Sequence, residues 1–220
     1  MRVVIAGGHG QIALILERML TQRGDSAAGF IRNPGHCADL EAVGAEPVVI
    51  DLENATADDV ATHLGGADAV VFAAGAGPGS GAARKETVDR DAAVLLADAA
   101  EAAHVTRYVM ISATGADADA PDGRDAVFTA YLRAKGAADD TIRSRAALDW
   151  TIVRPGHLTN DQGTGQVTIA EETLRGSIPR EDVAAVLLAV LDTPGTAGQT
   201  FEVISGDTPI SEAVTTSGRE

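Results

Sequence analysis

Short apolar runs alternate along this chain with segments in which apolar residues recur at the spacing of a helix. The apolar runs that we interpret as strands cover residues 2–6, 26–31, 46–51, 68–73, 106–112, 148–154 and 200–204. The helical patterns cover residues 11–23, 36–43, 56–64, 85–103, 127–146 and 180–192. Strands that alternate with helices indicate a parallel sheet covered by helices on both faces. We therefore predict an α/β fold, a doubly wound parallel sheet of the Rossmann type.

Two internal runs predict the centre of this sheet. Val70–Ala74 and Tyr108–Ile111 lack a clean alternation of apolar and polar residues, which is typical of strands buried on both faces. Ligands of doubly wound sheets bind beyond the carboxyl ends of the strands. The glycine-rich loop 74–84 and the acidic loop 115–125 both follow predicted strands, so we expect both on the ligand side.

Residues 157–177 are rich in turn-forming residues and contain a short strand-like piece at 166–170. A chain of 220 residues is long enough to bury a full core and is most simply one domain. We therefore expect a single domain over residues 1–220, with a small substrate-facing lobe at 157–177.

The first apolar run leads directly into the glycine-rich turn Gly7-Gly8-His9-Gly10-Gln11-Ile12-Ala13, and a helical pattern follows at once. This order brings unpaired backbone N–H groups and the positive end of a helix dipole to one point, which attracts phosphate. Gly7, Gly10 and the small Ala13 would let a pyrophosphate approach the backbone. The alternative is an ordinary strand–helix turn, but the position after the first strand favours dinucleotide binding.

Composition narrows the classes of partner. The formal net charge is −15, a field that repels nucleic acid and anionic membranes. The single cysteine, Cys37, excludes an internal disulfide and suits a reducing compartment. No basic-then-apolar leader precedes the first strand, and no apolar run approaches the roughly 18 residues of a membrane helix. We expect a cytoplasmic protein with a small-molecule substrate and neither nucleic acid nor membrane as partner.

The ends of the second and third predicted strands bear on the choice of cofactor. Arg32 and Asn33 follow the second strand, and no carboxylate occurs at residues 30–35. A carboxylate there would suit the ribose hydroxyls of NAD, whereas arginine suits the 2′-phosphate of NADP. We therefore predict NADP(H), with NAD(H) less favoured; a simple surface arginine is the alternative. Asp51 could accept a hydrogen bond from adenine, or serve equally well as a turn or cap aspartate.

The helical pattern 127–146 contains Tyr131 and Lys135, which a spacing of four places on one face. A nearby cation stabilises phenolate and lowers the tyrosine pKa, which prepares the hydroxyl for proton transfer. The chain has only two lysines, Lys85 and Lys135. An amphipathic surface pair is the alternative interpretation. The histidines share no metal-ligand spacing and no Cys/His cluster occurs, so we expect no metal site.

Taken together, these segments resemble an atypical short-chain dehydrogenase/reductase, of the group related to NmrA-like and biliverdin-reductase-B-like proteins and to NAD-dependent epimerases/dehydratases. The matching segments are Gly7–Ala13, Asp51-Leu52, Ala73-Ala74-Gly75, Tyr108–Ser112, Tyr131–Lys135, Val153–Gly156 and Ile178–Ala184. The resemblance covers essentially the whole chain. Its motifs are specific for the superfamily and the cofactor, and much less so for the reaction.

The resemblance implies roles for individual residues. Tyr131 would be the acid/base, and Lys135 would bind the nicotinamide ribose and lower the pKa of Tyr131. Either Ser112 or Thr114 would orient the substrate oxygen. Asp89 stands where related enzymes have asparagine, and Lys85 could face the cofactor loop or be solvated. The predicted cofactor site comprises Gly7, Gly8, His9, Gly10, Gln11, Ile12, Arg32, Asn33, Asp51, Leu52, Ala73, Ala74, Gly75, Lys135, Pro155, Gly156 and His157.

Three functions are compatible with these residues. The first is an NADP(H)-dependent oxidoreductase that reduces a small carbonyl, quinone-like or flavin-like substrate. The second is a sugar-nucleotide epimerase or dehydratase with retained cofactor, which the short segment 157–177 disfavours. The third is an NmrA-like NADP(H)-sensing protein without catalysis, which an intact Tyr131–Lys135 pair disfavours. For the oligomeric state, we expect a monomer or a weak homodimer.

Overall fold

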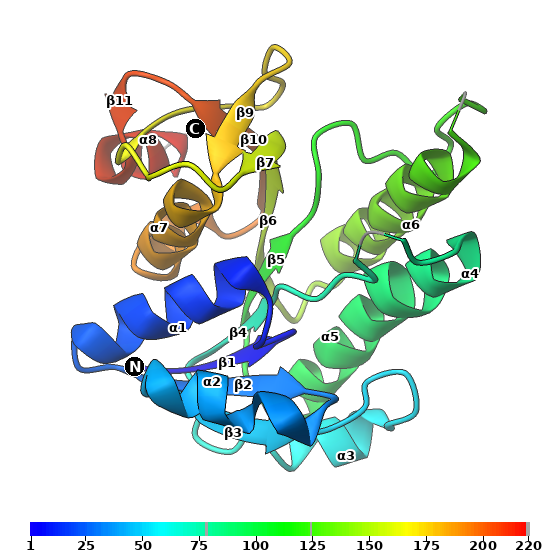
Figure 1. Ribbon diagram of the computed structural model, residues 1–220, viewed down its shortest axis with the longest axis vertical. Coiled ribbons are helices and arrows are strands. Elements are labelled where there is room, and N and C mark those ends of the chain that lie inside the picture. Colours follow the sequence, from blue (N-terminus) through cyan, green and yellow to red (C-terminus); the bar gives the residue numbers. More distant parts are fainter. Residues whose placement is uncertain (78, 124, 219–220) are drawn as a thin grey trace.

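The computed structural model describes residues 1–77, 79–123 and 125–218, and its main feature is a nine-stranded sheet between two layers of helices (Figure 1). The strands of this sheet are β1 (Arg2–Ala6), β2 (Ser26–Ile31), β3 (Glu46–Val49), β4 (Ala69–Phe72), β5 (Arg107–Ile111), β6 (Asp149–Pro155), β8 (Gln166–Ala170), β10 (Gln199–Ser205) and β11 (Thr208–Pro209). Their order is β11-β8-β10-β6-β5-β4-β1-β2-β3. β7 (His157–Thr159) and β9 (Ser177–Pro179) form a separate parallel pair.

The helices are α1 (Gln11–Gln22), α2 (Cys37–Ala42), α3 (Ala57–Ala61), α4 (Ala82–Arg84), α5 (Ala92–Ala102), α6 (Ala126–Arg143), α7 (Arg180–Leu191) and α8 (Ile210–Ser217). Two short 3₁₀ turns, η1 (Pro34–His36) and η3 (Pro194–Thr196), and a π-helical segment, η2 (Lys85–Asp91), complete the chain. α1 and α7 lie together on one side of the sheet, and α3 and α5 lie on the other (Figure 1).

The alternation of side chains along the central strands builds two separate cores. Val3, Ile5 and Val71 point toward α1 and α7 and belong to one apolar cluster. Val4 and Phe72, one position away on the same strands, belong to the cluster beneath α5 and α6. Successive residues of a strand face opposite sides, and both sides are buried here, which explains the uninterrupted apolar runs. The predicted doubly wound Rossmann-type fold is confirmed.

The carboxy-terminal edge of the sheet differs from the predicted pattern. β8 pairs antiparallel with both β10 and β11, so the sheet is mixed at this edge rather than wholly parallel. The strands β7, β9 and β11 and the helix α8 lie in segments that are too short or too polar to show a clear period in the sequence. The helix predicted over residues 85–103 is in fact two successive pieces, the π-helical η2 and α5, and the short α4 precedes them.

The sheet order creates a crevice at one point. β1 lies between β2 and β4, so the crossovers that leave β1 and β4 diverge to opposite faces of the sheet. Ligands bind at such a switch point, beyond the carboxyl ends of the strands. No helix among the described residues has the length and apolar character that a membrane-crossing helix needs.

Candidate functional site

The turn between β1 and α1 depends on glycine for close backbone contact. Gly7 has a φ of +82°, and a Cβ atom there would lie 2.6 Å from the Cα of Ala74 in the loop after β4. A Cβ on Gly8 would lie 2.6 Å from the Cα of Gly29 in β2. The first-turn N–H groups of α1, at residues 11–13, have no carbonyl one turn earlier to bond. These features fit the pyrophosphate of a dinucleotide, as the sequence predicts.

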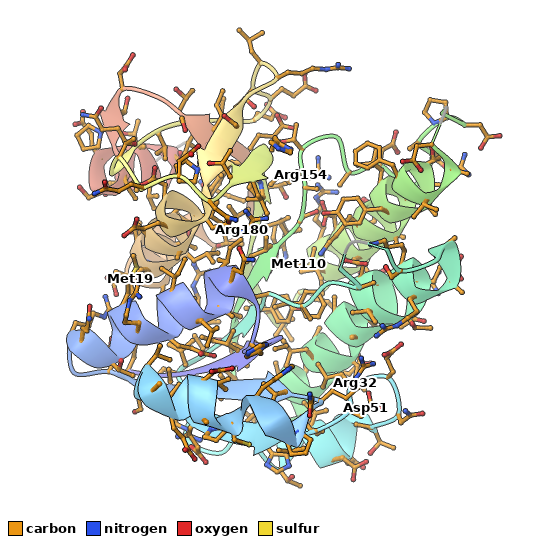
Figure 2. The ribbon with its side chains drawn as sticks, viewed as in Figure 1. Met19, Arg32, Asp51, Met110, Arg154 and Arg180 are labelled. Atoms are coloured by element: carbon orange, nitrogen blue, oxygen red, sulfur yellow. The ribbon has the colours of Figure 1, made fainter. Side chains whose placement is uncertain are left out.

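A cavity of about 360 Å³ lies between this turn and the ends of β2 and β3; we call it the first cavity. Its lining includes the predicted residues Gly7, His9, Gly10, Arg32, Asn33, Asp51, Leu52, Ala73, Ala74 and Gly75. Figure 2 shows Arg32 close to Asp51 at these strand ends. Its volume and its position at the switch point suit the adenosine half of a dinucleotide.

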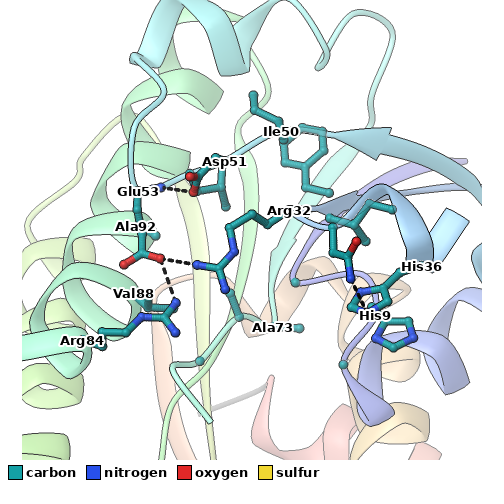
Figure 3. A pocket seen from close by; sticks show the side chains of 18 residues that line it. His9, Arg32, His36, Ile50, Asp51, Glu53, Ala73, Arg84, Val88 and Ala92 are labelled. Carbon is teal, nitrogen blue, oxygen red and sulfur yellow. Dashed lines mark hydrogen bonds and ion pairs between the residues drawn. The ribbon is translucent and has the colours of Figure 1, made fainter. Parts of the chain in front are cut away.

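Arg32 does not stand alone in the first cavity. Its guanidinium donates to Glu53 Oε2 at 2.7 Å, and Arg84 from α4 donates to the same oxygen at 2.7 Å (Figure 3). Thr87 donates to the other oxygen of Glu53 at 2.8 Å. The hydrogen bond from Arg84 is the main reason that the pKa of Glu53 lies below its usual range. Two arginines and one carboxylate therefore form a partly neutralised cluster at this end of the first cavity.

Imidazole rings line the other side of this cavity. The rings of His9 and His36 stack with centroids 3.6 Å apart, as Figure 3 shows. His9 Nε2 lies 2.8 Å from Asp39 Oδ2, and the Asn33 amide lies 3.3 Å from His36 Nε2. These contacts join the β1–α1 turn to the segment after β2.

The contacts of Asp51 bear on the two roles that its sequence position allows. It lines the first cavity, and its carboxylate also accepts hydrogen bonds from the Glu53 backbone N–H at 3.1 Å and from Asn54 at 2.8 Å. The hydrogen bond from Asn54 lowers the pKa of Asp51. The turn interpretation thus describes its contacts, while adenine recognition by Asp51 stays a prediction.

A second cavity of about 590 Å³ adjoins the first and shares with it Ala73, Ala74 and Gly75. Its lining brings together the predicted Tyr131, Lys135, Ser112 and Ile12. It also includes Gly77, Gly79, Ser80, Lys85, Asp89, Ile111, Asp125, Val127, Phe128 and Leu158. The glycine-rich loop after β4 thus lies on the ligand side as predicted. From the loop 115–125, Asp125 is the described residue that reaches this cavity.

The predicted coupling of Tyr131 to Lys135 is wrong in one respect. The Lys135 ammonium is buried, lies 3.4 Å from the carboxylate of Asp89, and donates to the Ile111 carbonyl at 3.1 Å. Burial raises the pKa of Tyr131, and the negative charges of Asp89 and Asp139 raise it further. Burial and these carboxylates therefore shift the pKa of the phenol in the direction opposite to the predicted one.

The structure separates the two candidate hydroxyl groups after β5. Ser112 lines the second cavity and lies beside the carboxylate of Asp139. Thr114 instead donates to the Arg154 carbonyl at 3.3 Å and lines neither cavity. Arg154 binds the buried Asp139 through two nitrogens, at 2.8 and 2.7 Å. Burial raises the pKa of Asp139, and the charge of Arg154 opposes that rise.

Some predicted residues lie outside the two linings. Gly8 is bound to the Phe30 carbonyl in β2, and Gln11 begins α1. The backbone of Pro155, Gly156 and His157 pairs with Thr114, Val203 and Gly176. The contribution of these residues to cofactor binding stays a prediction. The substrate-facing lobe at 157–177 also stays a prediction; from this segment, Leu158 lines the second cavity.

Sequence reasoning missed Glu53, Arg84 and His36 as members of the site. Arg84 had no signal, because a surface arginine in a helix is common. Glu53 lies two residues after Asp51, so its place beyond a strand end was a usable signal. Asp89 was named through the resemblance, but its ion pair with the distant Lys135 had no signal in the sequence.

Comparisons with known proteins agree with this geometry. Residues 7–194 match the protein family described as NAD(P)H-binding. A Bacillus subtilis protein named uncharacterized sugar epimerase YhfK is 36% identical over 215 residues, which cover 97% of this chain and 99% of that protein. A Bacillus halodurans structure, provisionally described as an NAD-dependent epimerase/dehydratase, is 37% identical with a TM-score of 0.89 and covers 98% of this chain and 99% of its own. The oxidoreductase ylbE from Lactococcus lactis is 26% identical with a TM-score of 0.87, over 98% and 96% of the two chains.

Proposed function

This chain belongs to the NAD(P)H-binding family, and we propose that within it the protein is an NADP(H)-dependent oxidoreductase that reduces a small carbonyl, quinone-like or flavin-like acceptor. The observation that carries the proposal is the continuity of the two cavities through Ala73, Ala74 and Gly75. A dinucleotide that places its adenosine half in the first cavity would bring its nicotinamide to the second, next to Tyr131.

Tyr131 is proposed as the proton donor. Because burial and two nearby carboxylates raise the pKa of its hydroxyl, the phenol keeps its proton at neutral pH. When bound, the reduced nicotinamide supplies the hydride that forms the new C–H bond of a carbonyl acceptor. The Tyr131 hydroxyl gives its proton to the acceptor oxygen, so that an alcohol results. Ser112, at the same cavity, would orient that oxygen, and Lys135 would hold the ribose.

Preference for NADP rests on the first cavity. Arg32 and Arg84 present two guanidinium groups at the end of β2, where a 2′-phosphate would lie. Glu53 neutralises part of this charge, so the phosphate must take over hydrogen bonds that the carboxylate now accepts. Arg32→Ala should therefore weaken NADP binding about tenfold more than NAD binding. Equal losses for the two cofactors, measured by calorimetry, would remove this assignment.

Turnover tests the reaction itself. NADPH oxidation should be observed with at least one acceptor in a panel of aldehydes, quinones and flavins. Tyr131→Phe should lower kcat by about a hundredfold while the dissociation constant of NADPH stays within twofold. A normal kcat for this variant would exclude Tyr131 as the proton donor. Silence across the panel together with firm NADPH binding would favour the non-catalytic sensor.

A sugar-nucleotide epimerase is the second candidate, because a relative that is 36% identical bears that name. Such an enzyme would use Tyr131 and Lys135 with a retained cofactor. Cofactor that co-purifies with the protein, and that no external acceptor oxidises, would support the epimerase over the reductase.

A further inference from the structure

Lys85 occupies an unusual position for one of the two lysines in an acidic chain. It begins the π-helical segment η2 and is 8% exposed. Its ammonium donates to the Gly77 carbonyl at 3.0 Å and lies 5.2 Å from the centroid of the Tyr131 ring. Lys85 therefore belongs to the second cavity, and the alternative of a solvated lysine is wrong.

The π-helical turn accounts for this placement. Lys85, Val88 and Asp89 are the buried residues of η2, and Lys85 and Asp89 both line the second cavity. A π-helical segment is rare and is frequent at functional sites. Its wider turn brings two side chains of opposite charge to the same wall, although they have different partners.

The two carboxylates that line this cavity have partners other than Lys85. Asp89 pairs with Lys135 and also accepts from the Ala76 N–H at 3.3 Å. Asp125 caps α6 by accepting from the N–H groups of Val127 and Phe128. Among the described residues, no carboxylate lies within ion-pair distance of the Lys85 ammonium. A buried ammonium satisfied by one carbonyl is a costly arrangement unless an anion binds to it.

Apolar side chains form much of the remaining lining. Phe128 and Tyr131 have ring centroids 6.0 Å apart, and Ile12, Ile111 and Leu158 also line the cavity. Phe128 is 55% exposed, so an apolar ring at the edge of the cavity is open to solvent. Flat apolar groups stack favourably on such rings.

We propose that Lys85 is the carboxylate-binding residue of the substrate site, and that the preferred substrate is a planar, apolar acceptor that carries a carboxylate. This inference rests on the proposed reductase function. The Lys85 ammonium pairs with the carboxylate, while the acceptor's reducible group lies toward Tyr131 and its ring lies against Phe128. The overall charge of −15 repels anions in general. A local cation, the Lys85 ammonium, would therefore be what selects carboxylate-bearing acceptors.

Two matched probes test the proposal: 4-carboxybenzaldehyde and its neutral methyl ester, methyl 4-formylbenzoate. The wild-type protein should show a kcat/KM for the acid that is about tenfold above that for the ester, since a hydrogen bond to a charged group is worth that much. Lys85→Met should abolish this ratio, and Lys85→Arg should restore most of it. No preference in the wild type, or an unchanged ratio in Lys85→Met, would overturn the proposal.

A matched control separates local pairing from the general effect of one lost positive charge. Arg90 lies on the same π-helical segment, pairs with Asp91 and lines neither cavity. Arg90→Met should keep the acid-to-ester ratio of the wild type. An equal fall in Arg90→Met and Lys85→Met would refute a specific contact.

Binding measured without turnover distinguishes this inference from the function on which it rests. Calorimetry on the NADP⁺-saturated protein should show about tenfold weaker binding of 4-carboxybenzaldehyde to Lys85→Met, with the NADPH dissociation constant within twofold. A large loss of NADPH affinity instead would mean that Lys85 serves the cofactor and would overturn the proposal. Lysine-dependent binding without reduction would contradict the reductase and sustain the carboxylate site.

Discussion

At the scale of single residues, Glu53 and Asp89 decide how much positive charge each cavity offers. Glu53 shares one oxygen between Arg32 and Arg84, both at 2.7 Å. Asp89 lies 3.4 Å from Lys135 in a fully buried pair. The first carboxylate is partly open to solvent and can be displaced, whereas the second is enclosed. An incoming phosphate can therefore compete for the arginines, while Lys135 keeps its partner.

Glu53→Gln should strengthen NADP binding by about threefold to tenfold and change NAD binding much less. The substitution removes a negative charge close to the proposed 2′-phosphate and leaves two guanidinium groups free to donate to it. Calorimetry at low and high salt measures the effect, which should shrink as salt screens the charges. The control is Glu46→Gln. Glu46 is the ion-pair partner of Arg2, and it lines neither cavity. Weaker NADP binding in Glu53→Gln would mean that the carboxylate is needed to order the arginines.

Much of the site could be predicted from local motifs, and the rest depends on long-range pairing. Gly7, Ser112 and Tyr131 lie in short patterns whose chemistry can be interpreted without the fold. Glu53 and Arg84 lie 31 residues apart, and their contact arises from the meeting of two loops. Because burial and, after it, the nearby carboxylates raise the pKa of Tyr131, this upward shift could not be predicted from the Tyr-x-x-x-Lys spacing.

At the scale of elements, the crossing of the β1–α1 turn with the loop after β4 is the most restrictive contact of the site. The Cα of Ala74 lies 2.6 Å from where a Cβ on Gly7 would be. The two strands are neighbours in the sheet, and each ends at this point. The loop after β4 also lines both cavities, so a shift at Gly7 would reach both halves of the site.

Gly7→Ala should lower the free energy of unfolding by about 2–4 kcal/mol and weaken NADPH binding more than tenfold. The positive φ accounts for about 1 kcal/mol of this loss, and the collision with Ala74 accounts for the rest. Gly24→Ala is the control, because Gly24 has a similar φ of +91° and nothing within 4 Å of its Cβ position. Urea unfolding measures both variants. Equal destabilisation would show that the collision relaxes without cost.

Elements with a strong period were predictable, and those held by tertiary contacts were not. β1, α1 and α7 carry apolar faces that define their limits to within a residue or two. The π-helical η2 has no distinct period, and its wider turn is stabilised by packing against α6. β8 was predictable as a strand, but its antiparallel partners were not, since pairing depends on how the chain returns from α7.

At the scale of the whole molecule, a buried carboxyl group links stability to pH. Glu17 on α1 is fully buried, and neither of its oxygens has a hydrogen-bond partner among the described residues. One oxygen lies 2.9 Å from where a Cβ on Gly8 would be, so the group packs beneath the phosphate-binding turn. Burial raises the pKa of Glu17 from 4.5 to about 8. Its position on the apolar face of α1, between Leu16 and Leu20, was visible in the sequence, but its protonation was not.

This shift predicts that Glu17 reduces stability progressively between pH 4.5 and pH 8. In that window the unfolded chain has released the proton while the folded protein still holds it, so the free energy of unfolding falls as pH rises. Above about pH 8 both states are ionised and the loss stays constant, at about 5 kcal/mol relative to acidic pH. Urea unfolding of the wild type and of Glu17→Gln at pH 5, 6.5 and 8 measures the effect, because the difference between the two curves cancels all other titrating groups. The wild type should lose stability relative to the variant as pH rises. Parallel curves would mean that Glu17 is already ionised in the folded protein, with water or a rearranged neighbour supplying its hydrogen bonds.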